Sequence, residues 1–210
     1  ELEIELVRGR PEAVVEVARR WAARHGLWLD LRSKAERGER LARGMHVVPA
    51  VKAGTVALDA DAGVDAAARA VLAVCLLQVV RNASEISTGD FQPEHVHQMR
   101  VGLRRMRSAL QLFEAWTSTL DPEWISGVAD LFRQLGVQRD RDVLEAGVLA
   151  SLRAAGAPMT DPRSAAQAAP ESACGDPTRI ARSQAFTDLM LQLQCYVLAP
   201  AQPASGDPEA

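Results

Sequence analysis

The feature that most constrains the fold is the apolar stretch "VDAAARAVLAVCLLQVVRN", which begins at Val64. Its Ala, Leu and Val residues cover most sides of the helix that the pattern predicts. A helix without a polar face is stable in water only when other elements surround it. The longest apolar run, near residues 70–80, is too short to cross a bilayer. We therefore expect a central helix of a soluble helical bundle.

The segments that follow supply the partners of this helix. Helices are predicted from Pro93 to about residue 118, from Pro122 through "EWISGVADLFRQLG", then separately through "VQRDRDVLEAGVLASLRAA", and through "SQAFTDLMLQLQCYVL". Residues near 155–179 are rich in Ala, Pro, Ser and Gly, which predicts a mobile loop, and residues 199–210 predict a disordered tail. No strand pattern follows residue 62. The expected domain, residues 63–198, is an antiparallel helical bundle.

The first 62 residues have a different pattern. "ELEIELVRG" alternates acidic and apolar residues, which predicts a strand. A helix is expected from Pro11 to about His25, because Pro suits a helix start and Gly26 suits its end. Residues 45–62 lack helical periodicity and predict a linker. The predicted fold class is mainly α, with a short α+β piece over residues 1–44.

Composition narrows the class of protein. The chain of 210 residues is 48% apolar and 24% charged, with a formal net charge of -3, as in soluble globular proteins. Its three cysteines are scattered and form no CxxC pair, so neither a zinc site nor a disulfide framework is predicted. A reducing cytoplasm fits this cysteine usage best.

Positive charge gathers in the segment "EHVHQMRVGLRRMRSALQLF", residues 94–113, which has no acidic residue after its first position. On a helical wheel, four of its residues fall within roughly 80° of one another and extend over about 15 Å. We call these residues the cationic stripe: His97, Arg100, Arg104 and Arg107. A separate face, formed by Met99, Leu103, Met106 and Leu110, is expected to pack in the core.

Two explanations for the stripe are open at this point. Like charges at these spacings repel by a few tenths of a kcal/mol per pair, so something must offset them. A solvated basic face, or salt bridges to acidic side chains on neighbouring helices, is the commoner explanation for such a pattern. The alternative is an anionic ligand, because the planar guanidinium fork binds two oxygens of an oxyanion at once. One small anion is too short for the stripe, whereas an extended polyanion fits. His95 and Arg105 lie off the stripe, and we expect His95 to be an ordinary surface residue.

Together with "LGVQRDRDVLEAGV", this segment resembles the CHAD domain, the conserved histidine α-helical domain, over roughly residues 63–198. The resemblance implies a helical bundle that binds inorganic polyphosphate through basic residues, here His97, Arg100, Arg104, Arg107 and Arg139, without a cofactor. Arg105 and Asp140 are possible supporting residues in this site, Asp140 by orienting an arginine. Asn82 stands where the family often has Asn. The family usually has a second helical half, so the seam exposed in this chain favours a homodimer.

"ELEIELVRG" and "SKAERGERL" resemble the closing segment of a CYTH domain, the triphosphate tunnel fold. That resemblance implies that Glu3 and Glu5 help to bind a divalent metal such as Mg²⁺ in a complete tunnel, and that Lys34 and Arg37 form its basic element. The opening strands of the tunnel are not in this sequence, so we expect no catalytic residue in this chain. The other interpretation of Glu1, Glu3 and Glu5 is the solvated face of an edge strand, which we prefer here.

The preferred function is therefore polyphosphate binding in the cytoplasm, with an association with polyphosphate granules as one option. The alternative is a fragment of a CYTH–CHAD inorganic triphosphatase. A nucleic-acid partner is disfavoured, because the net charge is acidic and no aromatic residues are interleaved with the arginines. No membrane partner is expected.

Overall fold

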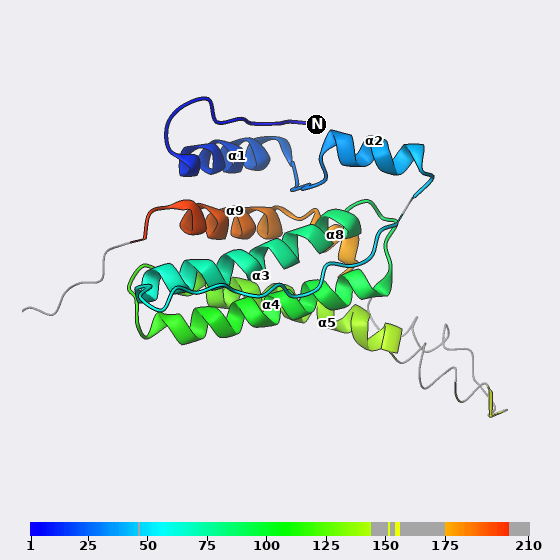
Figure 1. Cartoon of the computed structure of the whole chain (residues 1–210). Helices are drawn as coiled ribbons and strands as arrows, with labels where there is room; N and C mark the ends of the chain where they lie inside the picture. The colour runs from blue at the N-terminus through cyan, green and yellow to red at the C-terminus, as the bar shows by residue number, and fades with distance from the viewer. Residues whose placement is uncertain (46, 144–150, 152–153, 156–174, 202–210) are drawn as a thin grey trace, which may run out of the picture.

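The computed structural model describes residues 1–45, 47–143, 151, 154–155 and 175–201, and its elements are helices (Figure 1). The helices, in chain order, are α1 (Pro11–His25), α2 (Lys34–Ala42), α3 (Val64–Ile86), α4 (Pro93–Glu114), α5 (Pro122–Val143), α8 (Pro177–Ala181) and α9 (Gln184–Leu198). None of these described residues forms a strand. The prediction of a mainly α bundle is confirmed. Within the same residues, no helix is long and apolar enough to span a membrane.

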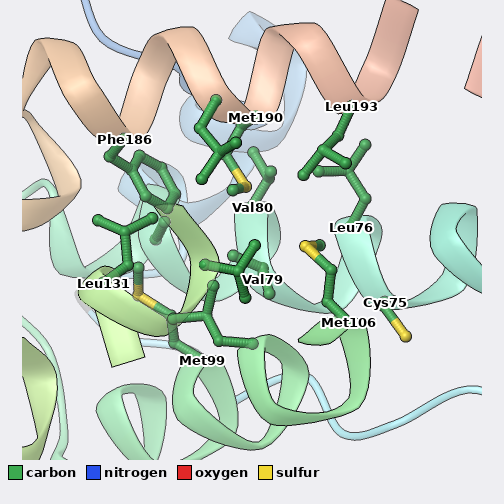
Figure 2. Packing of buried hydrophobic residues seen from close by; sticks show 14 of the residues in the cluster. Cys75, Leu76, Val79, Val80, Met99, Met106, Leu131, Phe186, Met190 and Leu193 are labelled. Atoms are coloured by element: carbon green, nitrogen blue, oxygen red, sulfur yellow. The ribbon is translucent and has the colours of Figure 1, made fainter. Parts of the chain in front are cut away.

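The centre of the bundle is the contact between α3 and α4 (Figure 2). Val79 of α3 and Met99 and Met106 of α4 are fully buried. At Gly102 the two helices approach so closely that an added Cβ would stand 2.7 Å from Val79 Cγ2. Gly is thus required there by packing rather than by backbone conformation.

Helices α5 and α9 complete the core. Leu131 of α5 and Phe186 and Met190 of α9 are buried against the α3–α4 pair, as Figure 2 shows. The start of α9 is fixed by Ser183, whose hydroxyl accepts a hydrogen bond from the Phe186 N–H. The apolar faces of four helices therefore enclose one contiguous core.

A buried polar cluster links the first turns of α3 to the end of α9. Arg69 of α3 donates to the Asp65 carboxylate at 2.8 Å and to the Ala199 carbonyl at 2.9 Å, and lies over the Tyr196 ring. The Tyr196 hydroxyl donates to Asp65 at 2.8 Å. Because each polar group has partners, this cluster can stay buried and hold α9 against α3.

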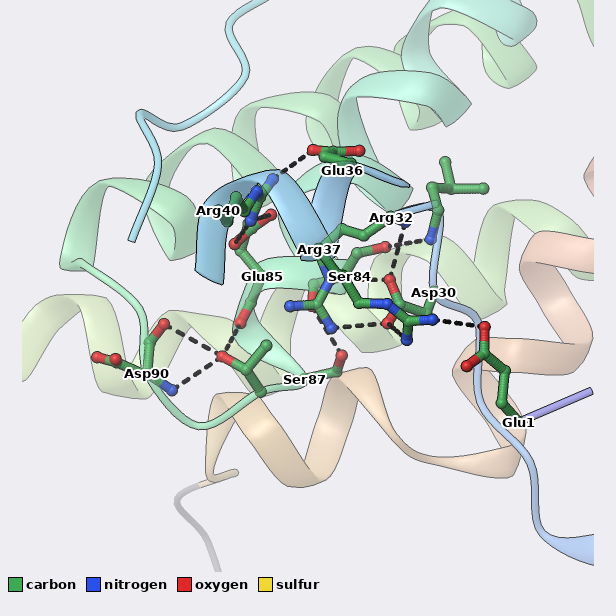
Figure 3. A network of polar contacts seen from close by, with 12 residues as sticks. Glu1, Asp30, Arg32, Glu36, Arg37, Arg40, Ser84, Glu85, Ser87 and Asp90 are labelled. Atoms are coloured by element: carbon green, nitrogen blue, oxygen red, sulfur yellow. Dashed lines mark hydrogen bonds and ion pairs between the residues drawn. The ribbon is translucent and has the colours of Figure 1, made fainter. Parts of the chain in front are cut away.

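Helices α1 and α2 lie against this bundle (Figure 1). Val15 and Ala22 of α1 pack on Leu191 of α9. Helix α2 is fastened by Arg40, whose Nη1 donates to both carboxylate oxygens of the buried Glu85 at 2.8 and 2.9 Å (Figure 3). The other terminal nitrogen, Nη2, donates to Glu36 of α2 itself, so the Arg40 guanidinium links α2 to Glu85 of α3 through charge-assisted hydrogen bonds.

The predicted N-terminal strand is wrong. Residues 1–6 have no strand partner among the described residues. Of their three apolar side chains, Ile4 is half-buried, whereas Leu2 and Leu6 are exposed. The acidic side chains instead pair with α2, Glu1 with Arg37 at 2.5 Å and Glu3 with Lys34 at 3.0 Å. Alternation predicts a strand only when a neighbouring strand completes the hydrogen-bond ladder.

Two helix boundaries also differ from the prediction. Helix α4 ends at Glu114, four residues earlier than expected. Helix α5 runs without a break through Gly136 to Val143, where two separate helices were predicted. A glycine inside a helix costs about 1 kcal/mol, which tertiary packing readily offsets. Helix α8 begins at Pro177, within the last residues of the predicted mobile loop near 155–179. Residues 156–174 of that loop and the tail residues 202–210 lie outside the described part of the chain.

Residues 47–58 of the predicted linker form an extended strap beside α3 and α4 (Figure 1). The fully buried Asn82 side chain accepts from the Val51 N–H at 3.0 Å and donates to the Val51 carbonyl at 2.9 Å. Farther along, Arg105 Nη2 donates to the Gly54 carbonyl at 3.4 Å. The Asn82 amide therefore satisfies both backbone hydrogen-bonding groups of Val51 and holds the strap against α3.

Asn82→Ala should release the strap. The substitution removes both hydrogen bonds to Val51 and a third, from Asn82 Nδ2 to the Gln78 carbonyl at 2.7 Å. Losing buried hydrogen bonds of this kind costs about 1–3 kcal/mol of unfolding free energy, which urea denaturation would measure. Limited trypsin digestion should then cut faster after the exposed Lys52. Gln111→Ala, at an exposed position on α4, is the control, and equal cleavage at Lys52 in both variants would contradict the role of Asn82.

The contact of α1 with α9 should weaken in acid. The hydrogen bond from Arg19 Nε to Asp188, at 2.8 Å, is the main cause that lowers the pKa of Asp188 below its ordinary value of 3.8. A lowered pKa in the folded state means that the pair stabilises the protein above that ordinary value and loses this effect as pH falls through the folded-state pKa.

Asp188→Asn should therefore lower the unfolding free energy at pH 7, by about 1 kcal/mol at most because the pair is partly exposed. The difference from the wild type should shrink below pH 3.8. Urea unfolding at pH 7 and at a series of acidic values would measure it, with Glu114→Gln as an exposed control. A difference that stays constant in acid would refute the pairing.

Candidate functional site: a cationic face of α4

The cationic stripe lies on the outer side of α4. Arg104 is exposed and His97, Arg100 and Arg107 are half-buried. The neighbouring face, about 100° around the helix from the stripe, holds Met99, Leu103, Met106 and Leu110 and is fully buried in the core, as predicted. Burial of the apolar face thus leaves the stripe accessible along the helix.

Helix α5 borders the stripe and supports two of its arginines. The Arg100 guanidinium carbon lies 4.8 Å from the centre of the Phe132 ring, and that of Arg107 lies 5.7 Å from the same centre. Both distances are within the range of cation–π attraction. One turn beyond Phe132, Gly136 has no side chain, and a Cβ there would stand 3.6 Å from Arg100 Nη2. Phe132 and Gly136 therefore form the part of α5 against which the Arg100 guanidinium lies.

The arginines of the stripe lack the carboxylate partners that several other half-buried arginines have. Arg19, Arg32 and Arg40 each form an ion pair with a carboxylate. Among residues whose side chains the structure describes, no carboxylate lies within ion-pair distance of the stripe. The side chains of Arg139 and Asp140, predicted to contribute, lie outside the described part, although their backbone belongs to α5.

Arg105 has a structural role away from the stripe. Its Nη1 donates to Gln78 Oε1 at 2.9 Å, and its Nη2 contacts the strap at Gly54. Gln78 in turn donates to the side-chain and backbone oxygens of Gln98. Arg105 therefore belongs to the polar seam between α3, α4 and the strap.

The prediction that His95 is a surface residue is wrong, because His95 is fully buried. Its Nδ1 accepts a hydrogen bond from the Gln92 N–H at 3.1 Å, and its own backbone N–H donates to the Gln92 carbonyl at 2.9 Å at the start of α4. Its Nε2 has no hydrogen-bond partner among the described residues. The signal was present in the sequence, since His95 stands four residues before Met99 and therefore on the core-facing side.

The residues predicted for a tunnel-type metal site do not form one in the described part of the chain. Glu3 is bound to Lys34, and no group of three His, Cys, Asp or Glu side chains is arranged to hold a metal there. Glu5 is exposed. Carboxylates paired with ammonium and guanidinium groups do not fit the ligand set of Mg²⁺.

Comparisons with known proteins show the family to which this chain belongs. A sequence model of the CHAD domain matches residues 70–210. The chain is 35% identical to the crystal structure of the CHAD domain from the plant Ricinus communis, with a TM-score of 0.52 over 71% of this chain. The match covers 50% of the plant domain, so this chain spans half of its length. No curated protein matches. By its sequence match and its helical fold, the chain belongs to the CHAD domain family.

Proposed function

We propose that this protein binds inorganic polyphosphate through the cationic stripe of α4. The observation that carries the proposal is the set of three arginines, Arg100, Arg104 and Arg107, on one accessible face without a carboxylate partner among the described side chains. Neighbouring like charges are unfavourable by themselves. A polyanion that lies along α4 would offset all of them together.

The chemistry of the side chains matches a chain of phosphates. Each guanidinium presents a rigid fork of N–H donors that binds two phosphate oxygens at once. A hydrogen bond to a charged group contributes about 1.5–3 kcal/mol where water is partly excluded. Arg100 and Arg107 are half-buried on α5, and Arg104 is open to solvent. The stripe therefore offers two supported contacts and one mobile one over its length of about 15 Å.

His97 extends the stripe toward the start of α4. It is half-buried and lies one turn before Arg100. An imidazole ring N–H can donate a hydrogen bond to a phosphate oxygen, so His97 would add a contact at this end of the stripe. Arg139 on α5 is a further candidate from the family resemblance. Membership of the CHAD family supports the proposal, because the resemblance to that family implies polyphosphate binding and does not depend on the geometry of the stripe.

The combined substitution of Arg100→Ala and Arg104→Ala should weaken binding of long-chain polyphosphate at least about tenfold, because two charge-assisted contacts are lost. Fluorescence anisotropy with end-labelled polyphosphate at moderate salt would measure the affinity. The matched control is Arg20→Ala with Arg24→Ala, which removes two exposed arginines at the same spacing of four from α1. Wild-type affinity should fall steeply with added salt, as it does when a polyanion releases counterions.

Equal affinity in the wild type and the Arg100, Arg104 variant would rule the proposal out. Equal weakening in the control pair would mean that net charge, not the stripe, governs binding. Competition with double-stranded DNA of the same phosphate concentration separates a polyphosphate site from a general polyanion surface. We expect polyphosphate to displace the DNA, whereas equal competition by DNA would indicate a general polyanion surface.

A second proposal concerns residues 1–44, which we infer to be related to the closing segment of a CYTH domain. What supports it is the pairing of Glu1 and Glu3 with Arg37 and Lys34 of α2, which brings together the two segments that carry the resemblance. The full-length protein should then release phosphate from triphosphate only with a divalent metal, which a colorimetric phosphate assay with and without chelator would measure. No release in either condition would exclude this activity.

A further inference from the structure

We propose that Phe132 of α5 is the positioning residue of the polyphosphate site, holding Arg100 and Arg107 in the orientation that binds phosphate. This inference rests on the proposed function and deepens it. Neither the charge pattern of α4 nor the motif residues of α5 point to this aromatic side chain. The contact is formed only when α4 and α5 pack together.

The geometry places one ring between two charges of the stripe. Arg100 and Arg107 are seven residues apart, so they lie on the same side of α4 about two turns from each other. Their guanidinium carbons are 4.8 and 5.7 Å from the centre of the Phe132 ring. A single aromatic side chain therefore contacts the two half-buried arginines of the stripe.

Phe132 is itself held in place. It is half-buried and packs against the hydrophobic core through the α5 side of the bundle. Leu131 and Leu135 beside it on α5 are buried in that core. A ring anchored in this way has few rotamers, so it can restrain a longer and more flexible neighbour.

Restraint matters because an arginine side chain has much conformational freedom to lose on binding. Ordering such a side chain at an interface costs about 0.5–1.5 kcal/mol, and a side chain ordered beforehand avoids that cost. The Arg107 Nε is buried without a hydrogen-bond partner in the described part, so this side chain already lies against α5 rather than in water. Gly136 leaves room for the Arg100 guanidinium at the same surface.

Arg104 provides the internal contrast. It is exposed, and no ring contact or ion pair is found for it within the residues described. The ring should therefore influence the contributions of Arg100 and Arg107 and leave that of Arg104 unchanged. This division is what distinguishes a positioning residue from a residue that only stabilises the fold.

The test compares Phe132→Leu, which keeps apolar volume without the ring, with Phe132→Tyr, which keeps the ring. Loss of the ring should weaken polyphosphate binding about three- to tenfold, because Arg100 and Arg107 would then have to be ordered on binding. Phe132→Tyr should stay within about twofold of the wild type. The slope of log affinity against log salt should be unchanged in Phe132→Leu, since no charge is lost, but lower by about one unit in Arg100→Ala.

A double-mutant cycle then assigns the effect to the two arginines. In the background of Arg100→Ala with Arg107→Ala, Phe132→Leu should change the affinity less than about 1.5-fold, because no cation remains on the ring. In the background of Arg104→Ala it should still cost about three- to tenfold. Thermal unfolding of each variant shows whether stability has been lost. Ile125→Val, a mild substitution elsewhere on α5, is the control for a general loss of packing.

The outcomes separate this inference from the proposed function. If Arg100→Ala with Arg104→Ala binds polyphosphate like the wild type, the proposed function fails. If the arginine variants bind weakly but Phe132→Leu and Phe132→Tyr both bind like the wild type, only the role of Phe132 fails. An effect of Phe132→Leu that is equal in all arginine backgrounds would likewise refute positioning, since it would show a general structural loss.

Discussion

The close contact of α3 and α4 at Gly102 is the constraint on which the rest of this structure depends. With a Cβ at that position, Val79 would have to move, because the added atom would stand only 2.7 Å from its side chain. Without it, the apolar faces of the two helices meet and bury Met99, Leu103 and Met106 completely. That burial fixes the rotation of α4 about its own axis. The rotation in turn directs the cationic stripe away from the core and toward α5.

The packing of the helices also decides which charged side chains find a partner of opposite charge. Where charged side chains are buried, they have partners: Arg40 with Glu85 at the end of α3, and Arg69 with Asp65 and the carbonyls of α9. These pairs avoid the large cost of an isolated buried charge. The stripe instead has an aromatic ring and a glycine beside it. An aromatic face attracts a guanidinium without neutralising it, so the charge stays available to a ligand.

The helical core was predictable because its signal is local. The apolar segment from Val64 and the spacing of Met99, Leu103 and Met106 report burial directly, since both depend only on helical periodicity. The stripe and the off-stripe place of Arg105 follow from the same periodicity. His95 was misplaced although the wheel put it near Met99, because a histidine suggested the surface. The strand over residues 1–6 was misjudged for another reason, since a strand exists only with a partner.

The sequence by itself determined that this chain forms a helical bundle with a basic helix, because 3.6-residue periodicity and proline at helix starts are properties of single segments. It also carried the motif residues by which the chain is related to CHAD domains. Only the tertiary structure decided what each charge contacts. Asn82 holds a strap 31 residues earlier in the chain, and Phe132 of α5 meets Arg100 and Arg107 of α4. Such pairings depend on how helices pack against one another, and no local pattern specifies them.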